Sequence, residues 1–424
     1  MAVAALVAAV LASLGPTAAS AKRLPRDYTS GENGTGMPSA PIVEPKGTRT
    51  RSRTRATTFS FSDVTSADAW AQRAIDYVAG TNDWMRDFSR NSDGTYTFAP
   101  GALETRKYFA RALVLAFAPD ELPDPTIVFS DVDPADTWYR YAAVAVSHGW
   151  IRGRADGAFL PESPVSMAAV HRGLVLALGL GPAAKALDHI HSATGQTFKV
   201  PRNFGTTVLG MRLFLRYNAP TGSEGNDVDP RTHLTRAQVA YSLFRAKTEA
   251  SYTVSDLLTQ YANVELPKLG PKRYALVQWG IRWAGWPYVW GGEWGLDSPE
   301  PSALGGQPRS GFDCSGFAWW LLRANDTSAW KVAPPRPYLG WSLAQRTSAS
   351  MASMAPDRLT YGELRPGDLV FYDGDGDGTT DHVDTYIGNG YALDSSSTPG
   401  GITVMWIGDG WYREHFLFGR RIIR

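Results

Sequence analysis

The stretch Phe312-Asp313-Cys314-Ser315-Gly316-Phe317 carries the single cysteine of a 424-residue chain, at the predicted start of a helix. Asp and Ser favour helix starts, and apolar residues follow the cysteine at helical spacing, at Phe317, Trp320 and Leu321. A lone cysteine forms no disulfide within its own chain. The positive end of a helix dipole favours the thiolate, which is the nucleophilic form. The stretch therefore predicts a reactive thiol, with a buried core cysteine as the alternative.

Strand-like segments follow the cysteine helix, which is expected over about residues 314–325. They are rich in β-branched and aromatic residues and are separated by Asp, Gly and Asn, as antiparallel strands are: residues 368–372, 383–387 and 401–406. A helix carrying a nucleophile ahead of a small sheet indicates an α+β domain over residues 271–424.

A cysteine nucleophile needs a base to take its proton, and that base needs an orienting group. His382 begins a strand-like run in the same domain, beside a polar loop, and is the favoured base. Asp394 is the best-placed carboxylate to orient it. His415 is the competing base, because the other five of the seven histidines precede this domain.

Five ordered motifs in this domain resemble those of the NlpC-type cell-wall cysteine endopeptidases, a papain-like α+β family. The motifs cover residues 287–292, 312–317, 346–349, 364–371 and 381–390. The resemblance implies that Cys314 is the nucleophile and His382 the base. It places the third residue at Asp394, where the family often has a second histidine, and makes Tyr288 a contributor to the oxyanion region.

The family's usual bond joins D-glutamate to the third, diamino residue of peptidoglycan stem peptides, and this chemistry requires no cofactor. Two residues depart from the family pattern, and Asp394 in place of the commoner histidine is the first. Asp384 stands where a glycine usually follows His-Val.

An acidic loop directly precedes and includes the candidate base. Residues 373–384 follow the calcium-binding EF-hand loop pattern, although no EF-hand helices flank them. The predicted ligands are Asp373, Asp375, Asp377, Thr379, Asp381 and Asp384. The sequence therefore predicts a structural calcium ion, and an acidic, glycine-rich β-turn is the alternative.

The middle of the chain repeats. Phe61-Ser62-Asp63-Val64 and Phe129-Ser130-Asp131-Val132 are each followed by a tryptophan, a helical pattern, an Asp-Gly turn and a second helix. A third, degenerate unit covers about 181–247 and retains Thr235-Arg236-Ala237-Gln238. Units that cannot each bury a full core are expected to associate as one helical module over residues 59–247, with the first two units at about 59–118 and 128–180.

These residues resemble S-layer homology repeats, whose Thr-Arg pair helps to bind anionic secondary cell-wall polymers. The resemblance implies that Thr105, Arg106, Thr235 and Arg236 bind such a polymer. The second unit departs from the pattern, because it has Ser166-Met167 at this position. A purely structural role of the repeats is the alternative.

The N-terminal segments indicate export. An apolar run at residues 2–14 has the length of a signal-peptide core, and Ala19-Ser20-Ala21 fits a cleavage site, although no Lys or Arg precedes the run. Residues 1–21 are therefore expected to be a signal peptide and residues 22–58 a disordered basic linker. Residues 248–270 are expected to form a connector. No later segment is apolar enough for a membrane span, and a net charge of +1 gives no nucleic-acid footprint.

The expectation is thus a multidomain protein: an α-helical S-layer homology module followed by an α+β papain-like domain. The predicted function is that of a secreted, wall-associated peptidoglycan hydrolase that cleaves stem peptides with Cys314, His382 and Asp394. Two alternatives remain, a wall-binding protein without catalysis, and an amidase or acyltransferase on the same scaffold.

Overall fold

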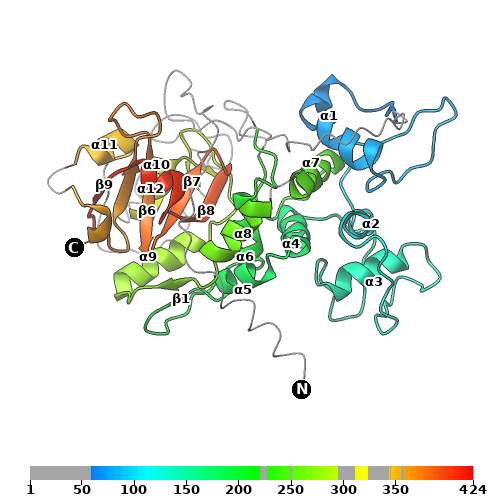
Figure 1. Ribbon diagram of the computed structural model, residues 1–424, viewed down its shortest axis with the longest axis horizontal. Coiled ribbons are helices and arrows are strands. Elements are labelled where there is room, and N and C mark those ends of the chain that lie inside the picture. The colour runs from blue at the N-terminus through cyan, green and yellow to red at the C-terminus, as the bar shows by residue number, and fades with distance from the viewer. Residues whose placement is uncertain are drawn as a thin grey trace, which may run out of the picture.

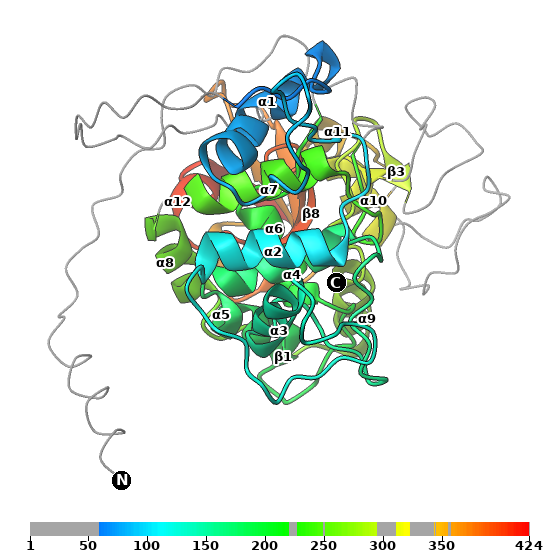
Figure 2. The same ribbon diagram turned by 90° about the vertical axis from the view of Figure 1, so that its right-hand side faces the viewer.

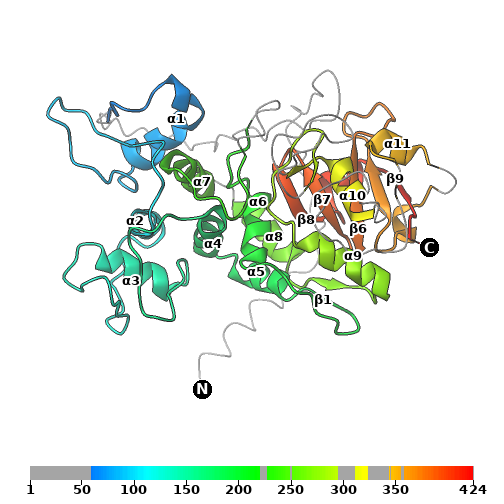
Figure 3. The same cartoon turned by 180° about the vertical axis from the view of Figure 1, so that it is seen from behind.

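The computed structural model describes residues 59–219, 227–248, 251–294, 311–322, 343, 345–354 and 358–423. The expected signal peptide and basic linker lie outside these residues. Figure 1 shows the described chain as two connected parts, with repeat helices at one end and a β-sheet at the other. The view from behind in Figure 3 shows α5, α6 and α8 between the two.

The first part is helical, as the repeats predict. A short 3-10 helix η1 (Ser66–Asp68) leads into α1, which continues as a π-helical segment, η2 (Asp76–Thr81). The α-helices are α1 (Ala69–Ile75), α2 (Arg106–Phe117), α3 (Tyr139–Ser147), α4 (Met167–Ala177), α5 (Gly181–Asp188), α6 (Phe204–Arg212) and α7 (Arg236–Thr248). The helices α2 and α4 are the expected second helices of the first two units, and α7 follows Thr235 in the third; α2 and α7 cross the middle of the view in Figure 2.

Three loops that precede α2, α4 and α7 are joined in a closed ring of backbone hydrogen bonds. Glu104 N donates to Leu234 O at 2.9 Å, Leu234 N to Val165 O at 3.0 Å, and Val165 N to Glu104 O at 2.9 Å. All three side chains are buried. Each loop thus supplies a hydrogen-bond partner to a backbone group of the next loop. The three segments therefore depend on one another to bury these backbone groups.

The repeated aspartates have the same structural role in the first two units. Asp63 accepts hydrogen bonds from Phe98 N and Ala99 N, and Asp131 accepts them from Phe159 N and Leu160 N. The second residue of each pair has a positive φ, 58° at both Ala99 and Leu160. The carboxylate therefore holds a strained turn that the Asp-Gly and Phe-x-Pro pattern alone does not reveal.

The expected connector is an integral part of the core. It contains α8 (Ser251–Gln260) and the strand β2 (Glu265–Leu266), which pairs in parallel with β1 (His191–Ser192). Tyr261 is fully buried, and its hydroxyl donates to Val404 O in the sheet at 2.6 Å. The polar composition of the segment predicts a connector, but its residues Leu257, Val264, Leu266 and Leu269 are buried as well.

The second part is α+β, as expected. Its helices are α9 (Pro271–Ile281), α10 (Cys314–Leu322), α11 (Ser348–Ala352) and α12 (Gly410–Glu414), with a 3-10 turn η4 (Tyr361–Glu363). A short hairpin pairs β3 (Glu293–Trp294) with β4 (Gly311–Phe312). The main sheet has the order β8-β7-β6-β5-β9. Its antiparallel strands are β5 (Leu369–Tyr372), β6 (His382–Gly388), β7 (Tyr391–Ser396), β8 (Gly401–Trp406) and β9 (Phe416–Arg420).

The two parts are in direct contact. Gly285 has a φ of +85°, and a Cβ there would lie 2.5 Å from a methyl carbon of Thr207 in α6, so only glycine fits. Buried Arg216 donates to Gly400 O in the turn between β7 and β8. The repeat module therefore supports the loops that surround the cysteine helix.

Candidate active site

Cys314 is the first residue of α10, and the preceding residue explains why the helix begins there. Asp313 Oδ1 accepts from Gly316 N at 2.5 Å and from Ser315 Oγ at 3.1 Å, as an N-terminal cap does. A Cβ at Gly316 would lie 1.9 Å from Gly292 O, so the helix start lies against the segment 287–292. The thiol, 6% exposed, thus sits at the positive end of the helix dipole.

A buried arginine that the sequence reasoning gave no role holds this helix start. Arg346 Nη1 lies 3.1 Å from Asp313 Oδ1, and its Nε donates to Glu293. Its Nη2 donates to Gly291 O and Gly292 O, both at 3.1 Å. The motif at 346–349 was the available signal. Its arginine joins the hairpin, the cysteine helix and α11.

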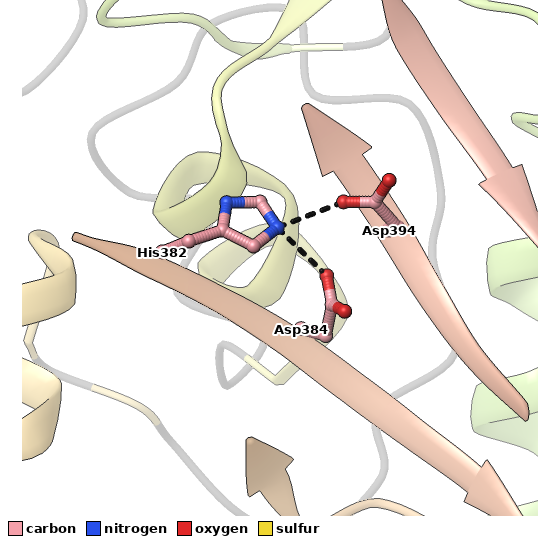
Figure 4. Close-up of side chains that lie close together, drawn as sticks. All are labelled: His382, Asp384 and Asp394. Carbon is pink, nitrogen blue, oxygen red and sulfur yellow. Dashed lines mark hydrogen bonds and ion pairs between the residues drawn. The ribbon is translucent and has the colours of Figure 1, made fainter. Parts of the chain in front are cut away.

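His382 meets two carboxylates through the same ring nitrogen (Figure 4). Its Nε2 lies 2.9 Å from Asp394 Oδ1 and 3.1 Å from Asp384 Oδ1. His382 and Asp384 are two apart on β6 and so share a face, and the pairing of Thr385 with Leu393 places Asp384 opposite Asp394 on β7. All three side chains are buried, at 0–4% exposure.

The electrostatics of this cluster depend on burial and on the two aspartates. Burial alone would lower the pKa of His382, but Asp384, Asp394 and a hydrogen bond with Cys314 hold this pKa well above its ordinary value. Burial and the neighbouring Asp394 raise the pKa of Asp384 to about 7. Because Nε2 is directed at the carboxylates, Nδ1 is the ring nitrogen left for the thiol. The structure thus brings Cys314, His382 and Asp394 together.

The other expected residues of this site lie as follows. Tyr288 is 4% exposed and forms a β-bridge with Phe312, two residues before the cysteine. His415 is directed elsewhere, since its Nδ1 is 2.8 Å from Trp411 O and its ring stacks on Trp411. Of the two candidate bases, His382 alone contacts the cysteine and the aspartates.

The acidic loop is only partly as expected. Carboxylate oxygens of Asp373, Asp375 and Asp377 lie within 4.8 Å of one another, which suits a shared cation. Asp381 Oδ2 accepts from Gly374 N at 2.7 Å, so it closes the loop. The Thr379 hydroxyl donates to Asp377 Oδ1 at 2.7 Å, which leaves its backbone carbonyl as the group for an ion.

The assignment of Asp384 as the last ligand of this loop is wrong. Its carboxylate is buried against His382 on the sheet rather than directed at the three loop aspartates. The strand alternation that places Asp384 beside the base also takes it away from the loop.

The assignment of Arg236 to polymer binding is also wrong. Its guanidinium is 1% exposed and is bound by Asp87 Oδ2 at 2.8 Å, Glu104 Oε2 at 3.1 Å and Phe98 O at 2.7 Å. Thr235 is partly buried and forms a β-bridge with Leu103. This Thr-Arg pair joins the third segment to the first.

The equivalent pair in the first unit is less buried. Arg106 Nε donates to Phe159 O at 2.6 Å, as Arg236 does to Phe98 O, and the Thr105 hydroxyl oxygen is buried with no hydrogen-bond partner among the residues that the structure describes. Arg106 also lines a cavity of about 770 Å³ between the repeat helices and the catalytic part.

This cavity is strongly cationic. The arginines that line it are Arg106, Arg152, Arg172, Arg202, Arg231 and Arg282, and the tryptophans are Trp150, Trp283 and Trp286. None of the described residues that line it is an aspartate or a glutamate. A site of this composition favours an anionic ligand with an apolar face, such as an acidic sugar.

Comparison with known proteins identifies two domains. Residues 285–421 match the NlpC/P60 family, and residues 128–168 match the S-layer homology domain. The chain therefore contains an NlpC/P60 domain, as the five motifs predicted, and an S-layer homology domain. This second match lies within one of the three predicted repeats.

Curated relatives are similar over the NlpC/P60 domain. Murein DD-endopeptidase MepH of Escherichia coli (strain K12) is 30% identical over 139 residues, which cover 33% of this chain and 42% of that protein. The bifunctional muramidase/DL-endopeptidase CwlT of Bacillus subtilis (strain 168) is 29% identical over 142 residues, 33% of this chain and 34% of that protein. The chain thus spans less than half the length of these relatives.

A solved structure of the peptidoglycan hydrolase RipB from Mycobacterium tuberculosis is 27% identical. The match covers 36% of this chain and 65% of the RipB chain, with a TM-score of 0.25. Separately, no helix in the described part of the chain combines the length and apolar character that a bilayer crossing needs.

Proposed function

We propose that the protein is a secreted, cell-wall-associated cysteine endopeptidase that cleaves peptidoglycan stem peptides between D-glutamate and the diamino residue. The observation that carries this proposal is the arrangement Cys314–His382–Asp394, with the thiol at a helix start and the imidazole oriented by a buried carboxylate. The named activities of the NlpC/P60 relatives support the same substrate class.

In the proposed reaction, His382 Nδ1 takes the proton of the Cys314 thiol and the thiolate attacks the scissile carbonyl carbon. Backbone N–H groups at the start of α10, with Tyr288, stabilise the oxyanion. The imidazolium then protonates the leaving amine, and water attacks the acyl-enzyme with His382 as base. Asp394 keeps the proton on Nε2 throughout, so that Nδ1 remains free to exchange the proton.

The test is mass spectrometry of soluble muropeptides released from purified peptidoglycan by wild type and by Cys314→Ala. New fragments that end in D-glutamate, formed by wild type alone, are expected. Fragments with another new end would indicate an amidase on the same scaffold. Protein that still sediments with walls but releases nothing would favour the binding protein without catalysis.

The arginine-lined cavity, rather than Arg236, is proposed to bind the anionic secondary wall polymer. Arg202, just before α6, and Arg282, just after α9, are exposed and line it, so each is removable without disturbing the core. We expect the double variant Arg202→Gln/Arg282→Gln to sediment less with walls. Arg365→Gln, an exposed arginine in the catalytic part, is the control and should bind as wild type does.

The acidic loop is proposed to bind a structural calcium ion through the carboxylates of Asp373, Asp375 and Asp377, with Asp381 and the Thr379 carbonyl completing the oxygen set. The ion would hold the loop that leads directly into the strand of His382. It takes no part in the chemistry.

A further inference from the structure

The second aspartate at His382 is not explained by the proposed triad. A neutral imidazole has one N–H, and two buried carboxylates compete for it, Asp394 Oδ1 at 2.9 Å and Asp384 Oδ1 at 3.1 Å. Two carboxylate charges this close, at 0% and 1% exposure, repel each other strongly because the side chains are shielded from solvent. One of the two must therefore hold a proton over part of the accessible pH range.

The hydrogen bonds show which carboxyl carries the charge. Asp394 Oδ2 accepts from Ser396 Oγ at 3.0 Å and from Tyr412 OH at 3.3 Å, in addition to the His382 contact at Oδ1. Three donors suit an ionised group. Among the described residues Asp384 has fewer donors: Nε2 of His382 faces its Oδ1, and the Tyr372 hydroxyl interacts with the carboxyl from β5. Of two carboxyls that compete for one imidazole N–H, the one with fewer donors is the one that suits the neutral acid.

We propose, on the basis of the proposed function, that Asp384 is a second positioning residue that stays protonated beside ionised Asp394 and, once ionised, strengthens the Cys314–His382 ion pair. The proton that Asp384 releases goes to solvent. The added negative charge beside Nε2 then stabilises the imidazolium, so a larger fraction of Cys314 is present as thiolate.

The surroundings are consistent with this switch occurring near neutral pH. Burial and Asp394 raise the pKa of Asp384 to about 7, and His382 opposes them. The other titratable groups that face Asp384 are Tyr372 from β5 and Tyr412 from α12, and both have a pKa raised well above the ordinary value by burial. They therefore stay neutral, and the ionisation of Asp384 is the change of charge at this site.

The test measures the alkylation rate of Cys314 by iodoacetamide between pH 5.5 and 8, in wild type, Asp384→Asn and Asp394→Asn. Cys314 is the only cysteine, so every alkylation event reports on this thiolate. Because a nearby charge shifts a pKa by about 1 unit or more, we expect wild type to react about tenfold faster than Asp384→Asn at pH 8 and equally fast at pH 5.5. Asp394→Asn should react slowly at every pH, and Asp120→Asn, an exposed site between the first two repeats, should match wild type.

A ratio of wild-type to Asp384→Asn rates that stays constant over this range would overturn the proposal, since a merely structural role gives no pH dependence. Should Asp384→Asn not fold, Asp384→Gly provides the same comparison with the residue that the family usually has. Alkylation needs no substrate. A pH-dependent ratio without peptidoglycan cleavage would therefore disprove the proposed function and leave the role of Asp384 intact.

Discussion

Arg236 Nη1 lies 3.1 Å from Glu104 Oε2, and both side chains are almost fully buried. The two residues are 132 apart in the sequence and come from the first and third segments of the repeat module. Their contact lies beside the ring of backbone hydrogen bonds through Glu104, Val165 and Leu234. The Thr-Arg pair of the third segment thus contributes to the stability of the module.

Replacing Arg236 by Met is expected to destabilise the protein by about 3–5 kcal/mol, because it leaves Glu104 buried without its cation and Asp87 with Arg111 alone. Thermal or urea unfolding of the full chain measures this effect. Arg106→Met is the matched control, because that arginine is partly exposed and donates only to carbonyl oxygens. If Arg236→Met lowers the free energy of unfolding no more than Arg106→Met does, the assignment of Arg236 to the core of the module is contradicted.

The stability of the module should fall as the pH rises from about 4.5 to about 8. Burial raises the pKa of Glu104 to about 8 even though Arg236 opposes it, whereas the ordinary value is 4.5. The folded state therefore binds more protons than the unfolded state in this interval. The contribution of protonated Glu104 to the free energy of unfolding is complete below pH 4.5 and is lost as the pH rises towards 8. The slope should approach about 1.4 kcal/mol per pH unit at most.

Urea unfolding at several pH values, with wild type beside Glu104→Gln, measures this dependence. The glutamine variant keeps the shape and cannot ionise, so its stability should change less over the same interval. Equal slopes for the two proteins would show that Glu104 is ionised throughout.

Peptidoglycan cleavage should fail in a graded way among variants of the candidate triad. Cys314→Ala and His382→Ala are expected to release no muropeptides. Asp394→Asn should lose on the order of 10³-fold or more in kcat/KM, because an amide favours the wrong imidazole tautomer. All three should retain wall sedimentation, since the cavity arginines are unchanged. Loss of sedimentation together with cleavage would indicate misfolding rather than a catalytic defect.

Much of the catalytic part was predictable from the sequence. The cysteine helix begins at Cys314, strands begin within one residue of the expected positions 368, 383 and 401, and His382 and Asp394 meet as predicted. These features follow from local patterns, namely a capping Asp, alternating apolar residues and turn residues. Such patterns predict the position of a helix or strand well when its conformation depends mainly on residues close in the sequence.

The errors concern residues whose partners lie far away in the sequence. Asp384 fits a loop pattern at position 12, but the alternation of β6 directs its side chain to His382 and Asp394. Arg236 resembles a polymer ligand, yet its acceptors lie 132 to 151 residues earlier. Burial of a charged side chain depends on tertiary contacts that no pattern around that residue contains.

Removing divalent cations is expected to lower the melting temperature and to slow cleavage. The carboxylates of Asp373, Asp375 and Asp377 lie within 4.8 Å of one another, and without a cation they repel. The loop ends at Asp381, next to His382, so a loosened loop also loosens the base. Differential scanning calorimetry and muropeptide release, each with excess EGTA and then with added Ca²⁺, measure both effects.

Asp375→Asn is the variant for this prediction, since it removes one central charge from an exposed position. EGTA should lower its melting temperature and cleavage rate less than it lowers those of wild type, because the variant site already binds the ion more weakly before EGTA is added. Mg²⁺ should not restore the wild-type protein as well as Ca²⁺ does, because a flexible loop of carboxylates and carbonyls suits the larger ion. A melting temperature and cleavage rate that EGTA leaves unchanged would mean that the loop is an acidic turn held by its own hydrogen bonds.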